Sequence, residues 1–292
     1  MHGFHGMSRA PVSVRRLTYP VVTTVACVCF AVMAEFEVPV LIAAYGAVLI
    51  ALAAIVASEW EWPFRPSWHP DRQALTSDTT FAITVQMALP TALSIGAALA
   101  ISNLANGSKP GLRDLWPHSL PAPVQVVLMV LVADLFRYPL HRAMHASPTL
   151  WRLHAVHHSP ERLYWLNVGR FHPLEKSFQW MLDALPFVIV GVSDQVLAGY
   201  FVFYAVNGFF QHSNCDVELG PLNYVISGPE LHRWHHSLDS EESNANYGNN
   251  VIIWDVLFGT RVLPMGRDVD RLGNRVPDYP QGFVDSLRRP FA

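Results

Sequence analysis

The sequence has few of the residues that build a water-exposed surface. Only 15% of its 292 residues are charged, whereas about 25% is usual for a soluble domain. It has three cysteines and no CxxC pair, which excludes a disulfide framework and an iron–sulfur cysteine pattern. No basic tract accompanies the net charge of −3, so no nucleic-acid partner is indicated. Because 51% of the residues are hydrophobic, these shortages favour an integral membrane protein.

Long uncharged runs predict membrane-spanning helices, because about 20 apolar residues cross a bilayer core of about 30 Å. After a basic N-terminal segment (1–16), such runs cover 17–34, 38–58, 81–102 and about 124–140. The first run is alternatively a cleaved signal peptide. The second run follows after only three residues, which favours a helical hairpin. We therefore expect an all-α membrane protein with about four spans, divided into 1–16, a transmembrane region over 17–123, a metal domain over 124–264 and a tail over 265–292.

Basic residues before the first span and after the second mildly favour a cytoplasmic N-terminus. Four spans then return the chain to the cytoplasmic side at His141, while the loop over 103–123 carries Lys109 and Arg113. A later apolar run, Trp180 to Phe210, is broken by Pro186 and Ser193-Asp194. It predicts two half-embedded helices or a hairpin in the membrane interface, with two further spans as the alternative. The tail over 265–292 is expected to be an extended cap.

Histidine is the residue in excess, since ten of the fourteen fall between His141 and His236. They form an HxxxH motif and two HxxHH motifs, and residues three and four apart share one face of a helix. Neutral imidazole is a common ligand of transition metals. The spacing therefore predicts a polyhistidine metal site that is dinuclear, with two single histidines nearby. The motif histidines are His141, His145, His154, His157, His158, His232, His235 and His236, and the single ones are His172 and His212.

The types of ligand in the clusters limit which metal ion the site is expected to bind. Structural zinc usually has cysteine among four ligands, and the HExxH glutamate of metalloproteases is absent here. A pair of ions held by imidazole nitrogens at a membrane surface is suited to iron and to O2 activation. In the fourth span, Asp134 could accept a hydrogen bond from a ligand imidazole or pair with Arg137, and Asp255 is a second candidate to orient an imidazole.

The order of these motifs resembles the fatty acid hydroxylase superfamily, also called the sterol desaturase family, in its bacterial type without a fused cytochrome b5 domain. The likeness covers roughly Val124 to Pro264 and includes HRWHHS at 232–237, NYG at 246–248 and FGT at 258–260. It implies a membrane-bound, O2-dependent oxidoreductase with two iron ions, for which zinc could substitute. The eight motif histidines, His212 and His172 are then ligands. The partners implied are a lipid substrate and a separate electron donor such as a ferredoxin or a cytochrome b5-type protein.

Two other functions remain open from the residues alone. One is a membrane zinc hydrolase, although no glutamate lies within a histidine cluster to act as its base. The other is a metal transporter or store, although the clusters follow the fourth span instead of lying within the spans. Within the oxidoreductase interpretation, hydroxylation is favoured over desaturation.

Overall fold

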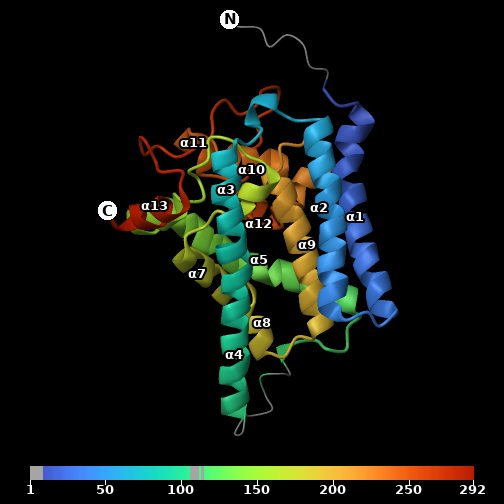
Figure 1. Cartoon of the computed structure of the whole chain (residues 1–292). Coiled ribbons are helices and arrows are strands. Elements are labelled where there is room, and N and C mark those ends of the chain that lie inside the picture. The colour runs from blue at the N-terminus through green and yellow to red at the C-terminus, as the bar shows by residue number, and fades with distance from the viewer. Residues whose placement is uncertain (1–8, 106–111, 113–114) are drawn as a thin grey trace, which may run out of the picture.

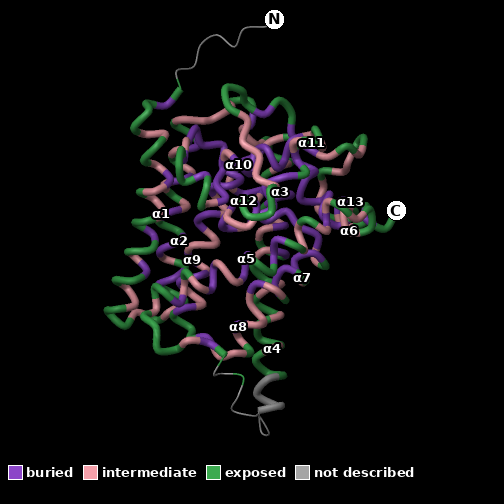
Figure 2. Tube along the Cα trace, turned by 180° about the vertical axis from the view of Figure 1, so that it is seen from behind, coloured by how far each residue is buried: buried purple, intermediate pink, exposed green. Residues whose placement is uncertain are grey.

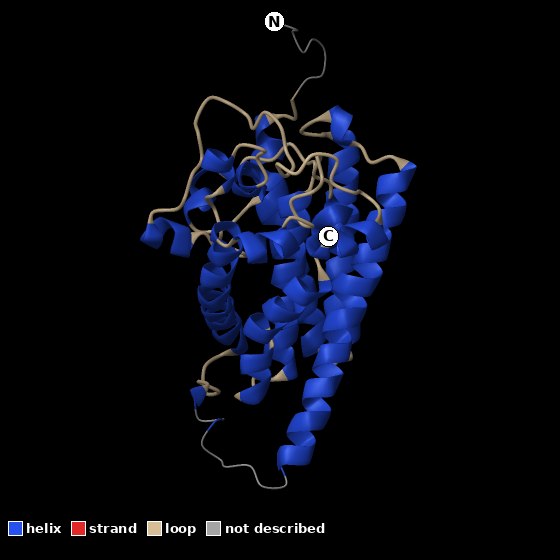
Figure 3. Ribbon diagram, turned by 90° about the vertical axis from the view of Figure 1, so that its left-hand side faces the viewer, coloured by secondary structure: helices blue, strands red, loops and turns tan. Residues whose placement is uncertain are grey.

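All regular secondary structure in the computed structural model is helical across the residues it describes, which are 9–105, 112 and 115–292 (Figures 1 and 3). In that part of the chain β-pairing is limited to isolated bridges, such as Ile226 with Val251. Four helices are long and apolar enough to cross a membrane, namely Val12–Glu35, Val40–Glu61, Arg72–Ala100 and Ala122–Ala146. The predicted all-α membrane architecture with four spans is confirmed.

The first two helices, α1 (Val12–Glu35) and α2 (Val40–Glu61), form the predicted hairpin and pack against α9 (Asp194–His212). Alanines at a spacing of four on α2, Ala43 and Ala47, are fully buried and allow the backbones to approach closely. The other sides of α1 and α2 expose large apolar residues, as expected of surfaces that face lipid.

The apolar run that ends at Phe210 folds differently from the interfacial hairpin expected for it. Its second half is one helix of 19 residues, α9, which lies alongside α1 and α2 (Figure 1). Ser193 begins this helix by accepting a hydrogen bond from the Val196 amide. Val202, Val206 and Phe210 then bury one face in the bundle. Packing against neighbouring helices, which the local sequence does not reveal, makes this segment a bundle helix.

The third span begins earlier than its uncharged run suggested. Helix α3 (Arg72–Phe81), the π-helical turn η2 (Ala82–Ala88) and α4 (Leu89–Ala105) form one continuous rod (Figure 1). Asp71 caps this rod by accepting from the Ala74 amide. The hydroxyls of Thr80 and Thr84 donate to carbonyls four residues earlier, so these polar side chains are satisfied within the helix. In the loop expected over 103–123, residues 106–111 and 113–114, which include Lys109 and Arg113, lie outside the described residues.

Short helices form a cap at one end of the bundle, where buried residues concentrate (Figure 2). The fourth span, α5 (Ala122–Ala146), leads into this cap. The predicted tail contains a helix and packs against the rest of the protein, so it is not simply extended: the ring of Phe283 meets that of Phe81 of α3 edge to face. The remaining elements are η1 (Pro66–Trp68), α6 (Pro148–His154), η4 (Trp165–Gly169), α7 (Pro173–Asp183), α8 (Leu185–Ile189), η5 (Gly220–Tyr224), α10 (Pro229–His235), α11 (Ser240–Ser243), α12 (Ile253–Phe258), α13 (Phe283–Arg288) and η6 (Arg289–Phe291).

Candidate metal centre

Nine of the ten histidines proposed as ligands meet in two groups, and within each group the ligand atoms lie within 4.8 Å of one another. His141 and His145 are half-buried, and the other seven are buried. The first group is His141, His145, His154, His158 and His235. The second group is His157, His212, His232 and His236.

Each HxxHH motif supplies both groups. In the earlier motif, His154 and His158 join the first group and His157 joins the second. In the later motif the roles are reversed: only His235 joins the first group. This division follows from helical spacing. The first and last histidines of each motif are four apart and lie on one face, whereas the middle histidine, next to the last one, points in another direction. Helices α5, α6 and α10 thus place their histidines around two adjacent centres.

The Nε2 atoms converge within each group. The Nε2 atom of His158 lies 3.1 Å from that of His154 and 3.2 Å from that of His235. In the second group, the Nε2 atom of His236 lies 3.0 Å from that of His232 and 3.2 Å from that of His157. The rings of His158 and His236 stack with centroids 4.3 Å apart, so the two groups adjoin.

Buried ring nitrogens without partners test whether the groups suit metal ions. The Nε2 atoms of His145 and His212 are buried and have no hydrogen-bond partner among the described residues. The Nδ1 atoms of the same rings do have partners, Asn244 Oδ1 at 3.1 Å and Asn167 Oδ1 at 2.7 Å. A metal ion in each group would satisfy these otherwise unpaired nitrogens. The residues present therefore fit a pair of ions.

Protein acceptors fix the tautomer of most of these rings. When Nδ1 donates its proton outward, the lone pair on Nε2 is free to bind a metal. The acceptors include two backbone carbonyls, that of Tyr247 for His141 at 2.8 Å and that of Ala245 for His235 at 2.7 Å. The carbonyl of Arg170 serves His157 at 3.3 Å. Ligand orientation thus depends on the backbone of the cap as well as on the histidines.

The electrostatic environment keeps the imidazoles neutral. Burial, followed by the neighbouring His154, lowers the pKa of His235 to about 3. Burial is also the main cause that lowers the pKa of His158 and His236 well below the usual range, followed by the other histidines. Because only the neutral ring can bind a metal through a lone pair, these rings are available as ligands at neutral pH.

One orienting residue, Glu175, was not identified from the sequence. Its side chain is fully buried, and its Oε1 atom accepts a hydrogen bond of 2.7 Å from Nδ1 of His154. Gln179 donates to the same oxygen at 2.9 Å. A carboxylate on the outer nitrogen of a ligand histidine fixes the ring and strengthens it as a ligand. The signal that could have revealed it is its position three residues after His172, at the start of a helix.

Replacing Glu175 with glutamine should weaken metal binding about 10- to 100-fold, because a neutral amide is a weaker acceptor for His154 than a carboxylate. Chelator competition on the metal-loaded protein measures this affinity. Glu242→Gln is the matched control, since Glu242 is a half-buried carboxylate of the cap that binds Ser237 and Arg267. Equal affinities of the Glu175 variant and the parent protein would exclude this orienting role.

His172 belongs to neither group, in contrast to its predicted role as a ligand. Its Nδ1 atom accepts a hydrogen bond of 3.1 Å from the Leu174 amide and caps α7. Its ring packs against Phe291, with centroids 5.5 Å apart. The Arg-Phe-His-Pro segment thus places this histidine at a helix start, where a side-chain acceptor stabilises the first turn.

The two aspartates proposed to orient imidazoles bind backbone amides instead. Asp134 accepts from the amides of Asn250 and Val251, both at 2.6 Å, and its supposed partner Arg137 donates to Asp183. Asp134 therefore neither accepts from an imidazole nor pairs with Arg137, because the backbone amides of residues 250 and 251 donate to its carboxylate. Asp255 accepts from the amides of residues 247 and 248. Asp255 therefore affects His141 only indirectly. It holds the backbone at residues 247 and 248, and the carbonyl of residue 247 accepts a hydrogen bond from the His141 ring.

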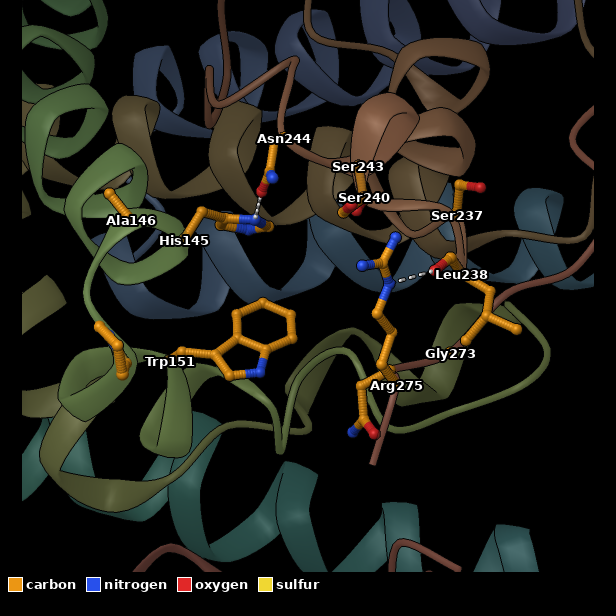
Figure 4. A pocket seen from close by; sticks show the side chains of 12 residues that line it. His145, Ala146, Trp151, Ser237, Leu238, Ser240, Ser243, Asn244, Gly273 and Arg275 are labelled. Carbon is orange, nitrogen blue, oxygen red and sulfur yellow. Dashed lines mark hydrogen bonds between the residues drawn. The ribbon is translucent and has the colours of Figure 1, made fainter. Parts of the chain in front are cut away.

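A cavity of about 280 Å³ reaches the first group at His145. Trp151 lies on one side of it, and the segment that carries Arg275 lies on another (Figure 4). Asn244, which accepts from Nδ1 of His145, also lines this space (Figure 4). The cavity connects the first group with the surface of the cap.

The segment that carries the histidine groups is similar to known proteins. Residues 126–260 match the family model described as fatty acid hydroxylase. Ornithine lipid hydroxylase OlsE of Rhizobium tropici is 32% identical over 254 residues, which are 85% of this chain and 76% of that protein. Alkylglycerol monooxygenase of Xenopus tropicalis is 32% identical over 46% of this chain and 30% of its own length. Methylsterol monooxygenase 1 of Rattus norvegicus is 27% identical over 45% of this chain and 44% of its own length. The search found no matching solved structure.

Proposed function

Because the chain belongs to the fatty acid hydroxylase family, we propose that it is a membrane-bound di-iron oxygenase that uses O2 to hydroxylate a C–H bond of a lipid. The observation that carries this proposal is the pair of adjoining all-histidine groups at the end of a membrane span. Bound iron would supply the activation of O2 that attack on an unactivated C–H bond requires.

The donor set favours iron over a zinc hydrolase. The first group offers five nitrogens, whereas catalytic zinc has three protein ligands and a water. A hydrolase also needs a base beside that water. Glu175, the carboxylate hydrogen-bonded to the first group, lies on the outer nitrogen of His154, away from the ligand atom. Helix α7 therefore supplies an orienting group there and no base.

The chain itself holds and orients the ligands and excludes water around them. Seven of the nine grouped histidines are buried, and the lowered pKa values of His158 and His235 keep these two rings unprotonated. Asn167, Asn244 and Glu175 hold Nδ1 protons on the outer side of their rings. These contacts pre-position the ligand nitrogens before an ion arrives.

The relatives indicate the substrate and the outcome. All three are named as hydroxylases or monooxygenases, which supports hydroxylation over desaturation. Ornithine lipid is the first substrate to test, because the ornithine lipid hydroxylase matches over most of both chains. We further propose that a separate ferredoxin or cytochrome b5-type protein delivers electrons, and that the metal centre lies on the cytoplasmic side of the membrane.

The test is oxygen incorporation by the full chain in lipid nanodiscs. The protein is loaded with iron, supplied with a reductase system and ornithine lipid, and exposed to isotopically labelled O2. Mass spectrometry should find a lipid product that has gained one labelled oxygen atom. A product that lacks two hydrogens would instead indicate desaturation. Lipid cleavage without O2 consumption would support the zinc hydrolase and overturn the proposal.

A further inference from the structure

Helix α7 has its polar face inside and its apolar face outside. Leu174, Phe178 and Met181 are between 40% and 50% exposed. Glu175 and Gln179, by contrast, are at most 2% exposed. A helix on a water-facing surface has the opposite arrangement. The outer face of α7 therefore suits lipid, and its polar face needs partners inside the protein.

Three oxygens on this polar face have no hydrogen-bond partner among the described residues. They are Oε2 of Glu175, Oε1 of Gln179 and Oδ1 of Asp183, which we call the acceptor stripe. Their residues are four apart, so they share one side of α7 over about 12 Å of helix rise. The other carboxylate oxygens of Glu175 and Asp183 do have partners: Oε1 of Glu175 accepts from His154, and Oδ2 of Asp183 accepts from Arg137.

Neighbouring helices enclose the stripe without satisfying it. Arg137 of α5 binds Asp183 at 2.7 Å, and Lys176 donates to the hydroxyl of Tyr204 on α9 at 3.0 Å. Lys176 therefore does not neutralise Glu175, which has no ion pair with a lysine or arginine among the described residues. The hydroxyl of Tyr200 on α9 is also buried and unpartnered, and it lies within electrostatic range of Asp183.

Buried acceptors without donors are costly, so this arrangement fits a bound group that is rich in N–H donors. An ammonium group offers three donors and a positive charge. The three oxygens extend over about 12 Å of the helix, too far for one ammonium to reach all of them. Gln179 donates to Glu175 at 2.9 Å, so the unpartnered oxygens of these two side chains adjoin, and one ammonium can bond to both. We propose that the Glu175–Gln179 end of the acceptor stripe binds a protonated primary amine of the lipid substrate, an inference that rests on the proposed function. The hydrogen bond from His154 to Glu175 places this amine site directly behind the first histidine group.

The test measures binding without turnover. Native mass spectrometry of the detergent-purified full chain gives the Kd of ornithine lipid, which carries a free amine, and of the same lipid after N-acetylation. The parent protein should bind the amine form at least about tenfold more tightly, as expected for a hydrogen bond to a charged group. In Gln179→Met this preference should fall to within about threefold, because one acceptor of the stripe is lost.

Two further variants complete the design. Ser177→Ala is the matched control on α7: its hydroxyl donates to the Pro173 carbonyl and lies off the stripe, so the preference should persist. Gln179→Leu removes the same acceptor with a differently shaped side chain and should also reduce the preference, which keeps the test valid if Gln179→Met fails to fold.

The outcomes separate the two proposals. Equal Kd values for both lipids in the parent protein would mean that the stripe holds only water, and would overturn the amine site whether or not the protein is active. A preserved preference in both Gln179→Met and Gln179→Leu would overturn it as well. A clear amine preference without any oxygenation in the nanodisc assay would support the amine site and count against the proposed reaction.

Discussion

Replacing His235 with alanine is expected to reduce lipid oxygenation by more than about 100-fold, because even residues that only orient metal ligands contribute 10- to 100-fold. The Nε2 atom of His235 lies 3.2 Å from that of His158, and its Nδ1 donates to the Ala245 carbonyl. Alanine therefore removes a ligand of the first group together with the contact that positions it. Elemental analysis of the purified variant should also show less iron per chain than in the parent protein.

Two other histidines serve as controls for this result. His69 stacks on Trp60 and belongs to neither group, so His69→Ala should keep its metal. His172→Ala should also keep its metal, since His172 caps α7 instead of joining a group. Full metal content and activity in His235→Ala would refute the assignment of the first group. Loss of metal in His172→Ala would restore its predicted role as a ligand.

Arg170→Met is expected to have the largest effect on stability, a loss of about 3–5 kcal/mol in the free energy of unfolding. The Arg170 side chain is 2% exposed, and it donates to Asp78 at 2.9 Å and to the Gln281 carbonyl at 3.0 Å. Methionine leaves the Asp78 carboxylate buried without its cation. The hydrogen bond from Arg170 to the tail at Gln281 is lost at the same time. Thermal unfolding in detergent should show a Tm lower by on the order of 10 °C.

Arg162→Met provides the matched comparison. Arg162 pairs with Asp71 at 2.8 Å on the surface, where their side chains are 34% and 58% exposed. Such an exposed pair contributes about 0–1 kcal/mol, so its loss should change Tm little. Similar Tm values for the two variants would contradict a special role for the buried pair. Adding Asp78→Asn to the Arg170→Met variant should recover part of the lost free energy of unfolding, because it removes the unpaired charge.

The histidine spacing was sufficient to predict which residues gather in the two histidine groups, apart from His172. Residues such as His154 and His158 meet because helical geometry places positions four apart on one face, and this geometry is local. The uncharged runs were likewise sufficient for the four spans. Both features depend on short-range periodicity, which can be seen in a single sequence.

Other parts of the site depend on contacts between distant segments. Glu175 meets His154 across 21 positions, and Asp134 meets the 250–251 backbone across more than 100. An isolated carboxylate gives no local sign of the amide or imidazole that will reach it. Helix α7 adds a second difficulty: its amphipathic pattern is clear, but which face points inward depends on whether lipid or water surrounds it.

The division of the histidines between the groups also sets an order of assembly. Four of the five histidines of the first group lie within positions 141–158, so only His235 must arrive from far along the chain. The second group draws on positions 157, 212, 232 and 236, so it needs the connection 213–231 to close before it has three ligands and the longer connection 158–211 to close before it has four. Loop closure costs conformational entropy that grows with loop length. During synthesis the first group is therefore nearly complete while most of the second is still untranslated, and on partial unfolding the second group is the first to lose its ion.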